Sequence, residues 1–322
     1  MFRKLQLVAL LFFICGGIVS VAFSSDRHII SHKENTINLD KEIDRLKASK
    51  SLVLPLEREI ELLKQLNSFD LGRSLLNSGG INGYWISYII NKGFGKHIDN
   101  ELEYWILNQA PLVMATQQRF GIFQKSLQHY LKSDSVMASI PCGVMDDLLG
   151  LDYSNAENVK LVGIDLDQKA LDLAEQNKQK HHLSNVEVVF AKEDAWKLSA
   201  TNEYDLITSS GLNIYEPDID QIIALYAQFC KALKPGGILV TSFVTPSPKI
   251  SKDSPWKDYV ESDLLMQQAV FGDLVNATWQ TKRTIYMTAE QMTLHLTKAG
   301  FEVIEVIYDK QSMFPTIIAR KV

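Results

Sequence analysis

The sequence predicts an α/β protein with a doubly wound, mostly parallel sheet and an antiparallel last strand, preceded by an all-helical N-terminal region. From Val136 onward, short apolar runs alternate with segments of helical periodicity, which is the pattern of βαβ units. Before Val136, apolar residues recur at helical spacing without strand-like alternation. The last two apolar runs lie too close together for a parallel return, so they are expected to pair antiparallel.

Composition bounds the class of protein. The chain has 322 residues, 46% hydrophobic and 22% charged, which suits one large folded domain with an addition. The formal net charge is −5 and no long basic run occurs, so no nucleic-acid partner is expected. The three cysteines, Cys15, Cys142 and Cys230, have no metal-ligand spacing, and the seven histidines form no metal cluster. A bridge between Cys142 and Cys230 is not expected.

Residues 1–25 form a hydrophobic leader or membrane anchor. A basic start precedes an apolar stretch, and Ser20-Val21-Ala22 fits a signal-peptide cleavage site. The run Leu5–Phe23 could equally span a bilayer uncleaved. Either interpretation makes the protein membrane-associated or exported, with membrane contact through this segment. If the start of the sequence is misassigned, the protein is expected to be cytoplasmic.

Residues 26–51 are polar and charged, and they are expected to form a linker. Residues 52–134 are expected to form a helical lid and substrate region. Pro55 suits the first turn of a helix, and Ile60, Leu63 and Leu66 recur after it at helical spacing. Further helices are expected at Tyr84–Ile90, Leu102–Leu107 and Leu112–Leu131.

Residues 135–322 are expected to form the α/β domain. Its strands should lie at Val136–Ile140, Lys160–Ile164, Val186–Phe190, Asp205–Thr208, Gly237–Phe243, Phe301–Tyr308 and Phe314–Ala319. Its helices should lie around Asp146 and at Gln168–Lys180, Asp218–Leu233 and Ala289–Ala299. Ligands of such sheets bind at the carboxyl ends of the strands, near the point where the strand order reverses.

The turn after the first strand discriminates between ligands. A dinucleotide needs a G-x-G-x-x-G turn so that the backbone can approach its pyrophosphate. Here the turn reads Pro141-Cys142-Gly143-Val144-Met145, so side chains fill two of the three glycine positions, and Asp146-Asp147 follow. Like charges about 4 Å apart repel by several kcal/mol at an effective dielectric near 20. The turn therefore disfavours a dinucleotide.

S-adenosylmethionine has no phosphate and carries a sulfonium and an ammonium group, so it suits this acidic turn. Asp165 ends the second strand, where its carboxylate can accept from both ribose hydroxyls, with Leu166 beside it. Asp167 is expected to cap the next helix. Asp146 and Asp147 could complement a helix dipole or contact the ligand's cationic end.

Two later strands end in residues that suit the same ligand. After the third strand, Asp194 could accept from an adenine amino group and the Ala195 amide could donate to the ring. Trp196 could flank the base or pack in the core. The fourth strand ends in small residues, Ser209-Ser210-Gly211, which leave room for a ligand.

From Val136 to Val322 the chain resembles the class I S-adenosylmethionine-dependent methyltransferases. The resemblance rests on the turn, the acid Asp165, the second acid Asp194, the small strand end, and Leu233-Lys234-Pro235-Gly236-Gly237 before the fifth strand. The family's acid-x-Gly-x-Gly-x-Gly motif aligns with residues 139–145, where Gly143 alone remains. The resemblance implies a Rossmann-like methyltransferase fold and S-adenosyl-L-methionine as cofactor. The implied cofactor site comprises Ser139, Pro141, Cys142, Gly143, Asp165, Leu166, Asp194, Ala195, Ser209 and Ser210.

Methyl transfer is an in-line displacement, for which a protein supplies alignment and exclusion of water. The sequence identifies no general base: His97 and His129 lie in the helical region, and His181-His182 lie at the edge opposite the ligand. Family members that methylate nucleic-acid bases or protein amides often carry Asn/Asp-Pro-Pro-Tyr after the fourth strand. The chain has Ser209-Ser210-Gly211-Leu212 there.

A small-molecule or lipidic acceptor is therefore expected. Its pocket would be formed by residues 82–90, the loop at Tyr215 and the insertion Pro246–Thr284. Tyr84, Trp85 and Tyr88 could face that acceptor or belong to the core. Two alternatives stay open: a degenerate cofactor-binding module, and another enzyme class on the same scaffold, such as an oxidoreductase or an aminopropyl transferase.

Overall fold

The computed structural model describes residues 37–77, 81–181, 183, 185–276 and 285–322. The expected leader, residues 1–25, lies outside these residues. No helix within the described ranges is long and apolar enough to cross a membrane.

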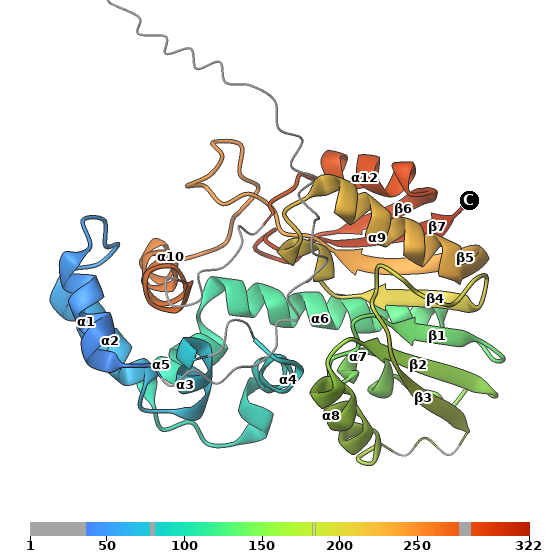
Figure 1. Ribbon diagram of the computed structural model, residues 1–322, viewed down its shortest axis with the longest axis horizontal. Helices are drawn as coiled ribbons and strands as arrows, with labels where there is room; N and C mark the ends of the chain where they lie inside the picture. Colours follow the sequence, from blue (N-terminus) through green and yellow to red (C-terminus); the bar gives the residue numbers. More distant parts are fainter. Residues whose placement is uncertain (1–36, 78–80, 182, 184, 277–284) are drawn as a thin grey trace, which may run out of the picture.

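A seven-stranded sheet with the order β3-β2-β1-β4-β5-β7-β6 forms one end of the molecule (Figure 1). Neighbouring strands from β3 to β5 pair parallel, and β7 pairs antiparallel with both β5 and β6. The predicted doubly wound sheet with an antiparallel last strand is thereby confirmed. The strands are β1 (Val136–Ser139), β2 (Val159–Asp165), β3 (Val186–Lys192), β4 (Tyr204–Ser209), β5 (Leu233–Ser242), β6 (Phe301–Ile307) and β7 (Thr316–Lys321).

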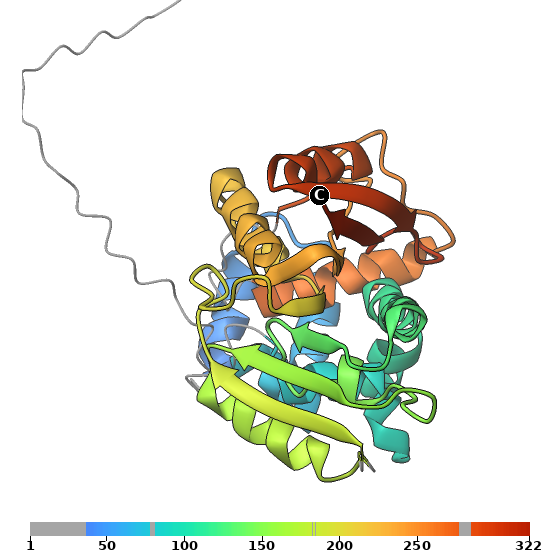
Figure 2. The ribbon, with the colours of Figure 1, turned by 90° about the vertical axis from the view of Figure 1, so that its right-hand side faces the viewer.

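Helices cover both faces of the sheet (Figure 2). One face packs against α9 and α12, where Tyr226, Phe229 and Leu296 are buried. The other face packs against α6, α7 and α8 through Phe123, Leu149 and other buried residues. Burial on both faces explains why the central strands are apolar runs without alternation. The helices are α6 (Pro111–Tyr130), α7 (Asp146–Leu149), α8 (Gln168–Lys178), α9 (Ile219–Ala232) and α12 (Ala289–Lys298).

A second apolar core lies at the other end of the molecule, among the N-terminal helices (Figure 1). Of residues 37–77 and 81–135, none lies in a strand, which agrees with the predicted helical region. The helices are α1 (Leu39–Ala48), α2 (Leu56–Leu66), α3 (Asp70–Asn77), α4 (Gly83–Ile90), α5 (Glu101–Asn108) and the short 3-10 helix η1 (Lys92–Gly95).

Two parts of this core differ from the sequence prediction. Residues 39–48 of the expected linker form α1, because Asn38 caps the helix and Leu46 is buried in the core. The insertion contributes α10 (Glu261–Gln267) and the π-helix η3 (Gln268–Asn276), which pack into the same core. The insertion was expected only at the acceptor pocket.

Polar contacts fix the insertion to the N-terminal helices. Trp105 Nε1 donates to Asp263 Oδ1 at 2.9 Å, and the Leu112 amide donates to Gln267 Oε1 at 2.5 Å. The Val53 amide donates to Asp273 Oδ2 at 2.8 Å. The helical region is therefore built from two chain segments that are far apart in sequence.

Candidate functional site

The strand order places the candidate residues at one edge of the sheet. The order reverses between β1 and β4, because β2 and β3 extend to one side and β5 to the other. Parallel strands present their carboxyl ends at the same edge, and ligands of such sheets bind beside the reversal. All ten predicted residues belong to the ends of β1 to β4 or to the turns that follow them.

The best defined contact in the site joins the ends of β1 and β2. The Gly143 amide donates to Asp165 Oδ2 at 3.0 Å, and the Asp167 amide donates to Oδ1 at 2.9 Å. These bonds orient the half-buried carboxylate, and each oxygen keeps a second lone pair for another donor. Burial raises the pKa of Asp165 above its ordinary value. The predicted cap also forms, since Asp167 Oδ1 accepts from the Lys169 amide at 2.9 Å.

Ser139 begins the first motif (residues 139–145), at the position where the family has an acid, and the carboxylate of Asp147 lies beside it. Ser139 donates through Oγ to Asp147 Oδ2 at 2.9 Å. Burial raises the pKa of Asp147 to about 6, and the hydrogen bond from Ser139 acts in the opposite direction. Asp146 has a different role, because its carboxylate accepts from Asn177 Nδ2 of α8 at 2.9 Å. Of these two acids, Asp147 is therefore the one that is hydrogen-bonded to the end of β1.

The residues after β3 are held by local bonds. Asp194 Oδ1 accepts from the Trp196 amide at 3.0 Å. The Trp196 ring donates through Nε1 to the carbonyl of Gln221 on α9 at 2.8 Å, and the ring packs against the core of that face. Ala195 is buried in the same core. Trp196 thus has a packing role, and Asp194 is an acidic side chain of this turn.

The remaining predicted residues of the turns differ in exposure. The side chains of Cys142 and Ser209 are buried, whereas Pro141 and Ser210 are exposed and Leu166 is half-buried. Cys142 and Cys230 are free thiols, and burial raises the pKa of Cys142.

Helix α4 of the N-terminal region touches the first-motif turn. A Cβ placed on Gly83 would lie 3.1 Å from Gly143 Cα and 3.1 Å from the Val144 amide nitrogen. The two backbones are therefore in direct contact, which requires glycine at position 83. Gly143 itself has a φ of 53°, in the left-handed region that favours glycine. Part of the region predicted as a lid, α4, therefore lies against this turn.

The aromatic residues of α4 divide between the core and the surface. Tyr88 is buried and donates through its hydroxyl to Glu103 Oε1 at 2.9 Å, and Trp85 packs on the N-terminal core. Tyr84 is 36% exposed and contacts the Trp85 ring edge-on. Two of the three aromatics are thus core residues, and Tyr84 is the one with an exposed face.

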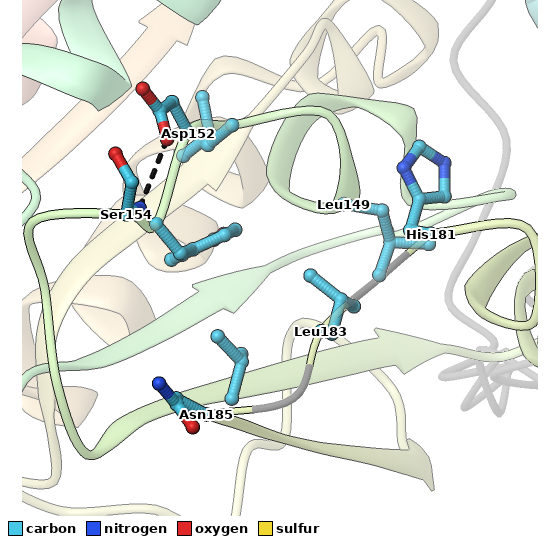
Figure 3. A pocket seen from close by; sticks show the side chains of 9 residues that line it. Leu149, Asp152, Ser154, His181, Leu183 and Asn185 are labelled. Carbon is cyan, nitrogen blue, oxygen red and sulfur yellow. Dashed lines mark hydrogen bonds between the residues drawn. The ribbon is translucent and has the colours of Figure 1, made fainter.

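The candidate histidines do not contribute to the site. His97 is exposed and pairs with Asp99 at 3.0 Å, and His129 is exposed in the last turn of α6. His181 lines a cavity of about 330 Å³ beside Leu183 and Asn185 (Figure 3). This cavity lies where β3 begins, at the edge opposite the predicted ligand, as expected for His181. A ligand site for a parallel sheet is not expected there.

Arg119 is a site residue that sequence reasoning missed. This residue of α6 is 8% exposed, and its Nη1 lies 3.4 Å from Ser242 Oγ at the end of β5. A single arginine in an amphipathic helix has the same sequence pattern as a solvated surface residue, so no local signal distinguishes it.

Comparisons with known proteins agree with the fold. A family model described as a methyltransferase domain matches residues 140–293. The crystal structure of a possible exported protein from Bordetella parapertussis is 40% identical, covering 88% of this chain and 94% of that chain with a TM-score of 0.82. Magnesium protoporphyrin IX methyltransferase from Synechocystis PCC 6803, solved with bound S-adenosylmethionine, is similar in fold. It is 14% identical, covering 79% of this chain and 99% of that chain, with a TM-score of 0.50.

Proposed function

Because this chain belongs to the class I S-adenosylmethionine-dependent methyltransferases, we propose that it methylates a small-molecule or lipidic acceptor at the carboxyl edge of the sheet. The cofactor supplies a methyl group that its sulfonium already activates for displacement. The described residues fit this cofactor, because Asp165 and Asp194 offer hydrogen-bond acceptors and Asp147 offers a negative charge for its ammonium group.

The contact between Gly143 and Asp165 carries the proposal. In this arrangement Asp165 accepts from the ribose hydroxyls through the lone pairs that the two backbone amides leave open. Asp194 accepts from the adenine amino group, and the Ala195 amide donates to the ring. Asp147, oriented by Ser139, attracts the ammonium group of the methionine end. Pro141, Cys142, Leu166, Ser209 and Ser210 complete the wall of the proposed site.

The chain's own contribution to the reaction is orientation and exclusion of water. Helix α4 covers the first-motif turn through Gly83 and separates it from solvent on that side. No general base is assigned.

The acceptor class rests on what surrounds the end of β4. The segment Ser209-Ser210-Gly211-Leu212 lacks the Asn/Asp-Pro-Pro-Tyr sequence used on bases and amides. A buried apolar cluster lies next to it, formed by Ala115, Ile214, Val244, Met313 and Phe314, with Trp256 of the insertion packed on it. These side chains favour an acceptor with an apolar body.

Calorimetric titrations with three compounds test the proposed function. S-adenosylhomocysteine is expected to bind with micromolar affinity, whereas a nicotinamide dinucleotide is not expected to bind. Tight binding of decarboxylated S-adenosylmethionine with weak binding of S-adenosylhomocysteine would indicate an aminopropyl transferase. Failure to bind any adenosyl compound would indicate a degenerate module and contradict the proposal.

The affinity for S-adenosylhomocysteine is expected to rise about tenfold from pH 5 to pH 7, because the ligand's ammonium favours ionised Asp147. Burial raises the pKa of Asp147 to about 6 in the absence of ligand. Below pH 6 the carboxyl group must therefore lose its proton before it can pair with the ammonium group of the ligand. Titrations at several pH values measure the slope. Asp147→Asn should lower the affinity at pH 7 and remove the slope; an unchanged slope in this variant would contradict the assignment.

We further propose that the protein is exported or held at a membrane by residues 1–25. The basic and apolar character of this segment supports the proposal, as does the description of the Bordetella parapertussis relative as a possible exported protein. N-terminal sequencing of the natural protein would distinguish a cleaved leader from an anchor or a misassigned start.

A further inference from the structure

Arg119 places a buried positive charge at the end of the sheet where the acceptor is proposed to bind. Its Nη1 lies 3.4 Å from Ser242 Oγ at the end of β5. A Cβ on Gly211, just after β4, would also lie 3.4 Å from Nη1. The guanidinium therefore lies at the carboxyl ends of β4 and β5, on the side of the sheet away from β2 and β3.

The charge of Arg119 is not paired with a carboxylate. No aspartate or glutamate among the described residues lies within 4.0 Å of its guanidinium, and its Nε is buried without a hydrogen-bond partner. Tyr215 and then Asp309 act on it electrostatically, but Tyr215 carries no carboxylate, and the Asp309 oxygens already accept from the Met313 amide at 3.2 Å and the Phe314 amide at 2.6 Å. A buried charge without a partner costs several kcal/mol, so such groups are normally paired or bound to a ligand.

Apolar side chains surround this charge. The Arg119 guanidinium carbon lies 4.8 Å from the centre of the Phe314 ring, which gives a cation–π contact. Ala115, one turn earlier on α6, belongs with Ile214 and Phe314 to the buried apolar cluster beside β4. Trp256 and Tyr259 of the insertion pack on the same cluster. A ligand that reaches Arg119 would therefore present an apolar body to these residues.

We propose that Arg119 binds the carboxylate of an apolar acceptor and so fixes the acceptor against the end of β4. The proposal rests on the proposed function and specifies its acceptor. A planar guanidinium has five donors and matches a carboxylate in two parallel bonds, and it gains strength where water is excluded. The free Nε supplies one donor for such a pair, and Nη1 beside Ser242 is held by a long, weak bond.

The cofactor also carries a carboxylate, which is the other source of the same chemistry. The proposed polar contacts of the cofactor lie at the ends of β1, β2 and β3, and Ser209 and Ser210 at the end of β4 only complete the wall. Arg119 instead contacts Ser242 at the end of β5. The position beyond β4 therefore favours the acceptor, and the experiment below separates the two sources.

Ligand-observed NMR titrations with 4-phenylbutanoate and its neutral amide, 4-phenylbutanamide, test the proposal with and without saturating S-adenosylhomocysteine. Wild-type protein is expected to prefer the acid at least tenfold. Arg119→Gln should bring the preference close to one while the affinity for S-adenosylhomocysteine stays within twofold. Arg119→Lys, which keeps the charge but not the planar donors, should retain part of the preference.

Each other outcome overturns the proposal. Equal binding of acid and amide by the wild type, no binding of either, or an unchanged preference in Arg119→Gln would exclude a carboxylate site. If Arg119→Gln weakens S-adenosylhomocysteine tenfold but not 5′-methylthioadenosine, the bound carboxylate is the cofactor's own. A merely structural arginine would lower the melting temperature of Arg119→Gln and leave the preference unchanged. The titration without S-adenosylhomocysteine keeps this test separate from failure of the proposed function.

Discussion

Replacement of Asp165 by alanine is expected to weaken S-adenosylhomocysteine binding about 100-fold, the largest effect of any side chain in the site. Two hydrogen bonds from ribose hydroxyls to a carboxylate contribute about 3 kcal/mol together, which corresponds to that factor. The substitution also removes the acceptor for the Gly143 amide, so the first-motif turn loses one of the bonds that hold it against β2. Calorimetric titration of the purified variant measures the loss.

Asp172→Ala is the matched control for Asp165→Ala. Asp172 is an exposed acid on α8 whose carboxylate accepts from Gln168 Nε2 at 3.0 Å, so both variants lose one negative charge near the same helix. The control should bind S-adenosylhomocysteine within twofold of the wild type. Asp165→Asn keeps one acceptor oxygen and should lie between the two. Unchanged affinity in Asp165→Ala, with a normal melting temperature, would remove the ribose role and the placement of the cofactor with it.

The sheet could be predicted from the sequence because each central strand is buried on both faces. Val159–Asp165 has five residues at or below nine per cent exposure, so it appears in the sequence as an apolar run ending in an acid. The position of Asp165 follows from where that run ends. Such information is local, whereas the handedness of the crossovers only restricts the order of the strands.

Contacts between distant segments could not be predicted in this way. Helix α1 is stable because Leu46 packs into a core whose other members include residues of the insertion, such as Val270. The isolated segment around Leu46 is polar, so its composition indicates a linker. Asp147 and Arg119 also depend on contacts that the sequence does not show. Asp147 is hydrogen-bonded to Ser139 of β1, and the Nε of Arg119 is buried without a hydrogen-bond partner.

Gly83→Val is expected to weaken S-adenosylhomocysteine binding about 30-fold, because it separates α4 from the first-motif turn. A Cβ at position 83 would lie 3.1 to 3.2 Å from three backbone atoms of Gly143 and Val144. The turn cannot yield easily, since the Cys142 amide donates to the Ile164 carbonyl at 2.8 Å and the Gly143 amide donates to Asp165. Overpacking of this kind costs about 2 kcal/mol, which corresponds to about 30-fold in affinity. Because the turn is held in place, we expect α4 to move away and uncover it.

Gly121→Val separates this effect from a general change in the helical region. A Cβ on Gly121 of α6 meets no atom within 4 Å, so the control should bind S-adenosylhomocysteine as the wild type does. Calorimetry and thermal melting of both variants give the comparison. If Gly83→Val keeps wild-type affinity, α4 packs on the turn without covering the cofactor, and the helical region acts only on the acceptor. If it loses affinity at an unchanged melting temperature, the contact between Gly83 and Gly143 couples the two cores through the cofactor site.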